Sequence, residues 1–374
     1  MLFQQCLTKC DQTHLYGPGG PSAPTYRAPT GAKKTFTGKI SRPRRGNPAE
    51  LAGLSGPAPA PWPVRPAQGR PHNSALEKGG PRGYILRTMG TQLTTDRAMV
   101  LARGLGTRMQ KKVEGLILDE QTARLADEGA KGLIPVGRPF LDHTLQALMD
   151  GGVRDFCLIV PPGASAFRKY YQAVAKGLEE GSVSFAVQAK PLGTADAVAA
   201  GEHWAADKPF MVFNSDNFYP PATVAALASA AAPATIAFER DALLAKSNIP
   251  AERVRRFAVL DIDAAGHLRR IVEKPDDPEA YTRDGRLYVS MNCFLFTPEI
   301  FTACKSIDMH PARKEYELPT AVQYTIDRMS LTYQAVSSDE GVLDLTGRSD
   351  IAPVRKMLAR HRVRFRGPQR LELD

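Results

Sequence analysis

From residue 97 onward, the hydrophobic positions show two patterns that alternate along the chain. Short apolar runs bounded by polar or glycine-rich segments predict buried strands, and apolar residues three or four positions apart predict helices between them. Strand–helix units repeated at this length predict a parallel sheet with helices on both faces and ligands at the carboxyl ends of the strands. The expected fold class is therefore α/β. Strands are expected at residues 99–102, 156–160, 183–187 and 210–213. Helices are expected after Arg138-Pro139 and ending at Gly151-Gly152, at 166–178 and after 193–194.

The pattern becomes mixed beyond residue 222. Ala264-Ala265-Gly266 separates two strand-like runs and predicts a hairpin, which inserts antiparallel strands beside the parallel ones. The polar segment 110–129 is expected to form a loop with helical pieces over the ligand site. The sheet as a whole is thus expected to be mostly parallel but mixed. Further strands are expected at 235–239, 258–262, 268–273, 287–296 and 331–336, and further helices at 298–303, 318–328 and 350–361.

Residues 1–90 differ in composition from the rest of the chain. They hold 13 of the 30 prolines and 13 of the 31 glycines, with almost no periodic apolar pattern. Such a segment buries too little apolar surface to offset chain entropy, so we expect a disordered, basic, Pro/Gly-rich extension. The catalytic domain is expected at 97–365, followed by a tail at 366–374. A further hypothesis is that translation starts at Met89, which would remove the extension from the native protein.

The net charge of +10 is confined to that extension. Residues 1–90 carry 13 Lys and Arg against 3 Asp and Glu, whereas the remaining chain has 36 of each sign. The part expected to fold therefore lacks the electrostatic footprint of a nucleic-acid-binding protein. No apolar run approaches the ~20 residues needed to cross a bilayer, and no secretory signal pattern is present. We expect no nucleic-acid partner, no membrane partner and a cytoplasmic location.

The five cysteines are few and scattered. Cys6 and Cys10 have no partners at zinc-binding spacing, and nothing in the pattern indicates disulfides. Cys157, Cys293 and Cys304 fall in apolar surroundings and are expected to be buried thiols.

A glycine-rich turn, Gly104-Leu105-Gly106-Thr107-Arg108, follows the first strand. Glycines let the backbone approach a ligand closely and expose successive N–H groups, and a helix starting just after would add the positive end of its dipole. These features favour phosphate, although a tight turn without a ligand has the same signature. The spacing matches neither the dinucleotide fingerprint nor the Walker loop.

Two aspartates are candidate metal ligands. Asp216 ends a strand, and Asp344 follows the apolar pair Val342-Leu343. Two carboxylates with phosphate oxygens completing the shell is how Mg²⁺ is usually held near a nucleotide. A strand-end aspartate taken alone is more often a cap. Candidate phosphate partners are Arg108, Lys131 and Lys274, the last oriented by Pro275 directly after it.

A second glycine turn combines Gln188 with Pro191–Ala195. There, an amide and exposed backbone groups can read the edge of a base. Thr194 as the N-cap of the next helix is an alternative that is compatible with this role. Asn292 lies within an expected apolar strand, where a buried amide needs partners, and a ligand hydroxyl or a backbone group would serve equally.

Taken in order, these motifs resemble the sugar-1-phosphate nucleotidylyltransferases, over roughly residues 97–347. The set is strong because the order of the motifs matches as well as their content. The matching segments are Leu101–Met109, Lys131–Pro135, Gln188–Ala195, Asp216-Asn217, Ile271–Pro275, Asn292 and Leu343-Asp344.

The resemblance implies a Rossmann-like fold of the nucleotide-diphospho-sugar transferase type. It also implies transfer of a nucleoside monophosphate from a nucleoside triphosphate to a sugar 1-phosphate, with release of pyrophosphate. The expected substrates are a hexose 1-phosphate and UTP or dTTP, with Mg²⁺ as cofactor; a homo-oligomer is left open. By analogy, Arg108 and Lys131 would be catalytic. Nucleotide would contact Ala102, Gly104, Gly106, Thr107, Gln188, Gly193 and Thr194; sugar phosphate would contact Glu273, Lys274 and Asn292; metal would bind Asp216 and Asp344.

Several positions depart from the family pattern and put base and sugar preference in doubt. Arg103 stands where alanine is usual, Ser215 replaces a glycine, and Cys293 replaces an alanine. Two other readings are a regulatory nucleotide-sugar-binding protein without catalysis, and a cytidylyltransferase for another phosphorylated alcohol. Retention of the paired carboxylates argues against the first. A glycosyltransferase is disfavoured because Asp216-Asn217-Phe218 has no second aspartate.

Overall fold

The computed structural model describes residues 94–368. The extension expected at 1–90, including Cys6 and Cys10, and most of the tail expected at 366–374 lie outside these residues. By internal contacts the chain divides into two units, Met1–Pro81 and Arg82–Asp374, and everything that follows concerns the second.

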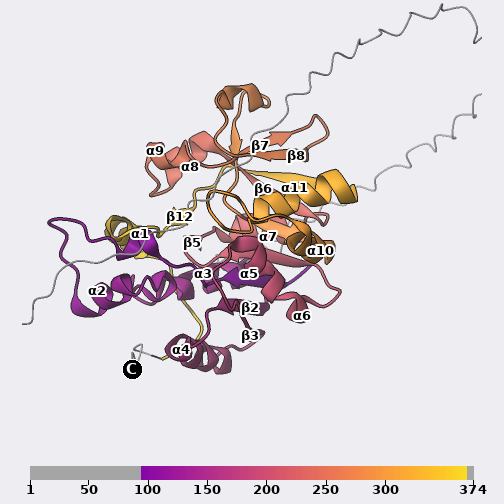
Figure 1. Ribbon diagram of the computed structural model, residues 1–374. Helices are drawn as coiled ribbons and strands as arrows, with labels where there is room; N and C mark the ends of the chain where they lie inside the picture. Colours follow the sequence, from indigo (N-terminus) through magenta and orange to yellow (C-terminus); the bar gives the residue numbers. More distant parts are fainter. Residues whose placement is uncertain (1–93, 369–374) are drawn as a thin grey trace, which may run out of the picture. The chain divides into compact units, whose positions relative to one another are not determined.

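Four parallel strands form one half of the sheet (Figure 1). They are β1 (Arg97–Leu101), β2 (Asp155–Val160), β3 (Ser182–Val187) and β4 (Phe210–Asn214), in the spatial order β3-β2-β1-β4. Successive residues of a strand point to opposite faces, and β1 follows this rule: Ala98 and Val100 belong to one buried cluster, whereas Met99 and Leu101 belong to the other. The sheet is thus covered on both faces, as the sequence predicts.

The helices of the two covering layers come from different parts of the chain. One layer contains α3 (Phe140–Asp150), α4 (Ser165–Lys176), α7 (Pro221–Ala228) and α12 (Ile351–Leu358). The other contains α5 (Thr194–Ala200), α10 (Glu299–Ser306) and α11 (Leu318–Met329). None of the helices between residues 94 and 368 is long and apolar enough to cross a membrane.

The second half of the sheet is mixed. Strand β10 (Phe294–Phe296) runs antiparallel between β4 and β6 (Ala234–Glu239), and β11 (Tyr333–Ser338) is parallel to β6. The predicted hairpin is confirmed: β7 (Val259–Ile262) and β8 (His267–Val272) pair antiparallel around Gly266. This hairpin joins the rest of the sheet through β9 (Tyr288–Val289) and β11.

The single strand predicted at 287–296 is wrong in one respect, because it is divided into β9 and β10. The division lies at Asn292, whose φ of 52° is in the left-handed region. A residue with that backbone cannot continue an extended ladder. As a result β9 pairs with β7, whereas β10 pairs with β4.

The three predicted buried thiols are confirmed, since Cys157, Cys293 and Cys304 are free and buried. Burial raises the pKa of Cys157 and Cys304 to about 12.

Short elements connect these layers. The remaining elements are α1 (Thr107–Gln110), α2 (Glu120–Asp127), α6 (Glu202–Ala205), α8 (Arg240–Lys246), α9 (Ala251–Val254), β5 (Asn217–Phe218), β12 (Leu343–Asp344) and the 3₁₀ turns Lys131–Leu133, Pro278–Tyr281 and Arg348–Asp350.

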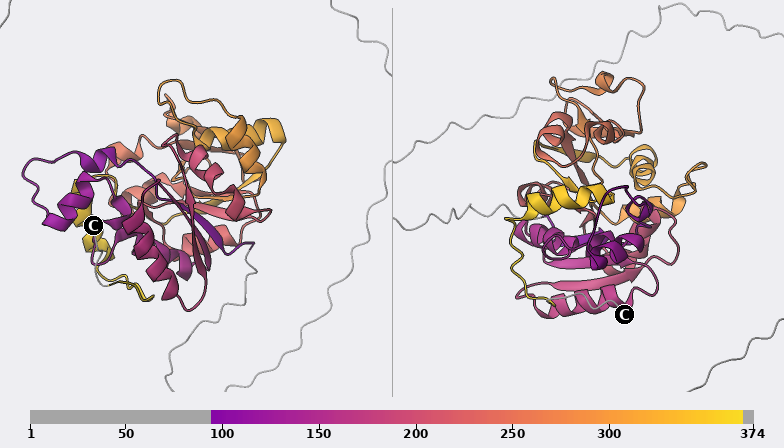
Figure 2. Two further views of the ribbon diagram at one scale, coloured as in Figure 1. Left: turned by 60° about the horizontal axis from the view of Figure 1, so that its bottom comes forward. Right: turned by 90° about the vertical axis from the view of Figure 1, so that its left-hand side faces the viewer.

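The C-terminal segment after α12 packs along the parallel half. Figure 2 shows it in yellow, running past the helices of that half. Phe365 joins the same buried cluster as α3 and α4, and the backbone N–H of Arg364 donates to the side chain of Gln146 at 2.7 Å. His361 Nδ1 lies 3.1 Å from Nδ1 of His143 on α3. The segment therefore forms part of the fold.

Candidate active site

A cavity of about 770 Å³ opens at the carboxyl ends of the parallel strands. Its walls come from the segments that follow β1, β2, β3 and β4, together with residues 128–133 just before α3. This is the edge where the sequence predicts ligands. The sequence-predicted residues that line the cavity are Ala102, Gly104, Gly106, Thr107, Arg108, Lys131, Gln188, Gly193, Thr194, Asp216 and Asn292.

The first glycine turn packs closely against the segment before Lys131. Gly106 has φ of 64°, and a Cβ placed on it would lie 2.4 Å from the backbone oxygen of Gly129. Glycine is therefore required at Gly106 by the fold itself. Gly104 faces open space, with nothing within 4 Å of a Cβ placed there. Its small size keeps the wall of the cavity clear, which is the property a phosphate-binding turn needs.

The helix that follows this turn is short. Helix α1 has four residues and ends at Gln110. One turn carries little of a helix dipole, so this helix adds little to the binding of an anion. Positive charge at the turn comes instead from side chains. Arg108 has no ion-pair partner among residues 94–368, and Arg103 donates from Nε to the backbone oxygen of Gln188 at 3.3 Å. Arg103 thereby ties the glycine turn to the end of β3.

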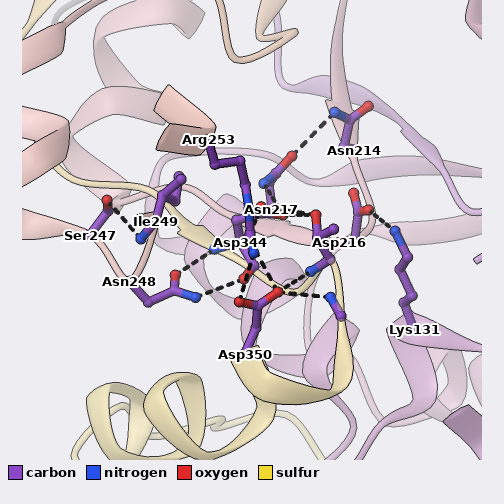
Figure 3. Close-up of polar contacts among 12 residues, drawn as sticks. Lys131, Asn214, Asp216, Asn217, Ser247, Asn248, Ile249, Arg253, Asp344 and Asp350 are labelled. Atoms are coloured by element: carbon purple, nitrogen blue, oxygen red, sulfur yellow. Dashed lines mark hydrogen bonds and ion pairs between the residues drawn. The ribbon is translucent and has the colours of Figure 1, made fainter. Parts of the chain in front are cut away.

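Lys131 and Asp216 form an ion pair inside the cavity. The Nζ–Oδ2 distance is 2.7 Å, and their side chains are 18% and 26% exposed (Figure 3). Lys131 begins the 3₁₀ turn before α3, and Asp216 lies in the turn between β4 and β5. A cation and a carboxylate are thus held together on the wall of the cavity.

Asp344 lies behind Asp216 and does not line the cavity. It is 5% exposed and stands opposite Asn217 in the β5–β12 pair. Both of its carboxylate oxygens accept from the hydroxyl of Thr346, and Oδ2 also accepts from Nη1 of Arg253 at 2.8 Å. Burial, and then the negative charge of Asp216, raise the pKa of Asp344. The two carboxylates therefore lie within electrostatic reach of one another.

Three residues that the sequence reasoning missed hold Asp344 in place (Figure 3). Asn248 pairs with the Asp344 backbone, donating to its carbonyl and accepting from its N–H, each at 2.8 Å. Arg253 on α9 donates to Asp344 and to both oxygens of Asp350. Asp350 also accepts from the backbone of the turn after β12. In the sequence, the only sign of these contacts is the basic run around Arg253, and such a run is equally typical of a solvent-exposed helix face.

The second glycine turn holds Gln188 firmly. Its Nε2 donates to the backbone oxygen of Gly193 at 2.9 Å and to Oδ2 of Asp196 at 2.8 Å. Gly193 has φ of 107°, and a Cβ there would lie 2.4 Å from the backbone oxygen of Tyr316, so glycine is required. Thr194 as an N-cap is wrong. Gly193 occupies that position, and the Thr194 hydroxyl accepts from the N–H of Leu318 at 2.9 Å.

The three predicted sugar-phosphate residues are divided between two places. Asn292 lines the cavity, because the break between β9 and β10 places it there. Glu273 and Lys274 lie at the end of β8, exposed and outside the cavity lining. Glu273 is 3.8 Å from Arg313, and Lys274 has φ of 45°. The structure therefore gathers the predicted nucleotide residues and leaves part of the predicted sugar-phosphate set apart from them.

The chain matches known proteins over this same region. Residues 122–354 match the family described as Nucleotidyl transferase. A glucose-1-phosphate thymidylyltransferase of Streptomyces griseus is 30% identical over 234 residues, which cover 62% of this chain and 57% of that protein. A low-salt glycan biosynthesis nucleotidyltransferase of Haloferax volcanii is 24% identical, with the same coverage of both chains. The matched part thus spans little more than half the length of these curated relatives.

Solved structures share the fold at lower sequence identity. A UDP-glucose pyrophosphorylase complexed with UDP-glucose superposes with a TM-score of 0.52 at 15% identity, covering 71% of this chain and 99% of that one. An inositol-1-phosphate CTP transferase from T. maritima gives a TM-score of 0.52 at 18% identity, covering 71% and 96%. These likenesses confirm the nucleotide-diphospho-sugar transferase type of α/β fold. The match over residues 122–354 places this chain in the nucleotidyl transferase family.

Proposed function

We propose that the protein transfers a nucleoside monophosphate from a nucleoside triphosphate to a sugar 1-phosphate. The observation that carries this proposal is the cavity at the carboxyl ends of β1 and β4, where the glycine turn, Lys131 and Asp216 converge. The names of the relatives, several of which are glucose-1-phosphate thymidylyltransferases, support the same reaction class.

The chemistry requires little beyond alignment and charge cancellation. An oxygen of the sugar 1-phosphate attacks the α-phosphorus, the bond from that phosphorus to the bridging oxygen breaks, and pyrophosphate leaves with the electron pair. The attacking oxygen is already an anion, so no general base is needed. The turn at Gly104–Arg108 would hold the triphosphate, and Lys131 would offset charge at the reacting phosphates. Lys131 would exchange its contact with Asp216 for one with phosphate.

The donor set of the site fits Mg²⁺. Asp216 and Asp344 are hard oxygen ligands, and the effect of Asp216 on the pKa of Asp344 marks negative charge that a divalent cation would balance. No group of three or more acidic, His or Cys side chains with metal-binding geometry occurs in residues 94–368, so phosphate oxygens and water would complete the shell. Bound Mg²⁺ would supply charge stabilisation to the phosphates.

The acceptor is proposed to be a hexose 1-phosphate and the donor UTP or dTTP. Gln188 and Gly193 would meet the base, since both line the cavity beside the glycine turn. Asn292 lines the same cavity and would contact the sugar phosphate from the other side. Glu273 and Lys274, at the open end of β8, would approach that substrate as it binds.

An activity panel tests the proposal. The full chain with Mg²⁺ is incubated with each nucleoside triphosphate and a set of sugar 1-phosphates, and pyrophosphate release is measured. At least one pair should turn over, and Lys131→Met should lower that rate about 100-fold, the loss typical of one transition-state charge contact. Lys112→Met, in the exposed loop after α1, serves as the matched control. Nucleotide binding without turnover across the whole panel would contradict catalysis and favour a regulatory protein.

A further inference from the structure

The side-chain amide of Gln188 is held in one orientation. Both hydrogens of Nε2 are used, one toward the backbone oxygen of Gly193 at 2.9 Å and one toward Asp196 at 2.8 Å. A carboxylate and a carbonyl oxygen can only accept hydrogen bonds. Turning the amide over would place its oxygen against two other oxygens. These two acceptors therefore fix the positions of the amide nitrogen and the amide oxygen of Gln188.

This orientation leaves the amide oxygen, Oε1, available to accept a hydrogen bond from a ligand. No group among residues 94–368 donates to Oε1 of Gln188, and the residue lines the cavity while being only 4% exposed. A buried acceptor that meets another acceptor loses its hydrogen bond to water and gains none in return. Gln188 can thus accept from a base but cannot donate to it.

The two kinds of pyrimidine differ at this point. Uracil and thymine carry a hydrogen on N3, whereas N3 of cytosine carries a lone pair. An amide that is free to turn over could form a hydrogen bond with N3 of either kind of base. An amide that is locked with its oxygen toward the base can accept only from the N3–H of uracil or thymine. The lock depends on Asp196, which lies in the first turn of α5 and does not line the cavity itself.

We propose that Asp196 is a positioning residue for base selection: by fixing Gln188 as an acceptor, it makes the cavity take uracil or thymine through N3–H and reject cytosine. This inference rests on the proposed function, because it assumes that Gln188 faces the base. It adds a residue that determines specificity and a definite direction of preference. Sites that leave a buried polar group unpaired against the wrong substrate discriminate strongly, by 10²-fold or more.

The test measures equilibrium binding of UTP, dTTP and CTP to the full chain by calorimetry, with pyrophosphate release followed separately. The wild-type protein should bind UTP or dTTP about 100-fold more tightly than CTP. Asp196→Asn lets residue 196 present either an oxygen or an NH₂ group, so Gln188 can turn over. The preference should then fall about tenfold and not vanish, because the Gly193 carbonyl remains. Asp207→Asn, an exposed aspartate before β4, should leave the preference unchanged.

A purely structural role for Asp196 predicts a different result. Loss of support for α5 would weaken UTP and CTP binding by the same factor, and that outcome would overturn the proposal. Equal binding of UTP and CTP by the wild-type protein would overturn it as well. If Asp196→Asn does not fold, Gln188→Met removes the acceptor and should abolish the preference; a preserved preference again overturns the proposal. Base preference without pyrophosphate release would contradict the proposed catalysis while leaving this inference intact.

Discussion

The residues proposed to bind nucleotide and those proposed to bind the sugar phosphate, here called the nucleotide side and the acceptor side, are positioned in different ways. On the nucleotide side, the turn at 104–108, residues 188–196 and Asp216 all follow parallel strands directly and meet at one edge of the sheet. On the acceptor side, Glu273 and Lys274 stand at the end of an antiparallel hairpin, outside the cavity lining. Parallel strands bring their ends together by topology, whereas a hairpin end can point in many directions.

The two carboxylates repeat this contrast. Asp216 faces the cavity, where Lys131 is its partner. Asp344 is buried behind it and held by Arg253, which comes from α9 in the mixed half of the chain. Asp216 thus lies where a ligand in the cavity could reach it, whereas Asp344 is anchored. The residues proposed to bind nucleotide already line one cavity. Glu273 and Lys274 would reach the sugar phosphate only if the end of β8 moved toward it.

The largest expected effect comes from Asp216→Asn. Removing the carboxylate removes a proposed metal ligand, and metal-borne charge stabilisation is worth several kcal/mol, so turnover should fall about 1,000-fold. Pyrophosphate release with saturating substrates measures this. The thermal midpoint should change little, because Asp216 is partly exposed and its ion pair with Lys131 contributes modestly. Asp308→Asn, at an exposed position after α10, is the control. Activity within tenfold of wild type would refute the metal role of Asp216.

A second prediction concerns how the stability of the protein depends on pH. His143 on α3 is buried against His361, and burial, followed by the charge of His361, lowers its pKa from 6.5 to about 4. Between these pH values the unfolded chain binds more protons than the folded one. The contribution of His143 to the free energy of unfolding is therefore fully present above pH 6.5 and is lost as the pH falls toward 4. The loss at pH 5 should be about 2 kcal/mol.

Urea unfolding at pH 7 and pH 5 checks this value. His143→Gln, which cannot titrate, should lose distinctly less stability over the same interval. His203→Gln is the control, since that histidine lies on α6, away from α3. A wild-type protein equally stable at both pH values would contradict the buried, neutral state of His143.

The residues proposed to bind nucleotide were placed together correctly from the sequence, and those proposed to bind the sugar phosphate were not, for the same structural reason. A motif that follows a buried parallel strand has its position fixed by the strand, so Gly104, Gln188 and Asp216 could be placed together from the pattern alone. The break at Asn292 could not be foreseen, because its neighbours are as apolar as those of an unbroken strand. Arg253 could not be found either, since its pairing with Asp344 joins positions 91 residues apart.

The smallest expected effect tests whether the acceptor side closes. Lys274 is exposed and outside the cavity lining, so its contribution depends on a contact formed with the sugar phosphate. Lys274→Ala should raise KM for the sugar 1-phosphate about tenfold, the loss typical of one hydrogen bond to a charged group, and leave KM for the nucleoside triphosphate unchanged. Initial rates with each substrate varied in turn give both constants. Lys208→Ala, an exposed lysine before β4, should change neither. Equal KM values for the variant and wild type would mean that Lys274 stays away from the substrate, and that Asn292 and the cavity wall bind the sugar phosphate without it.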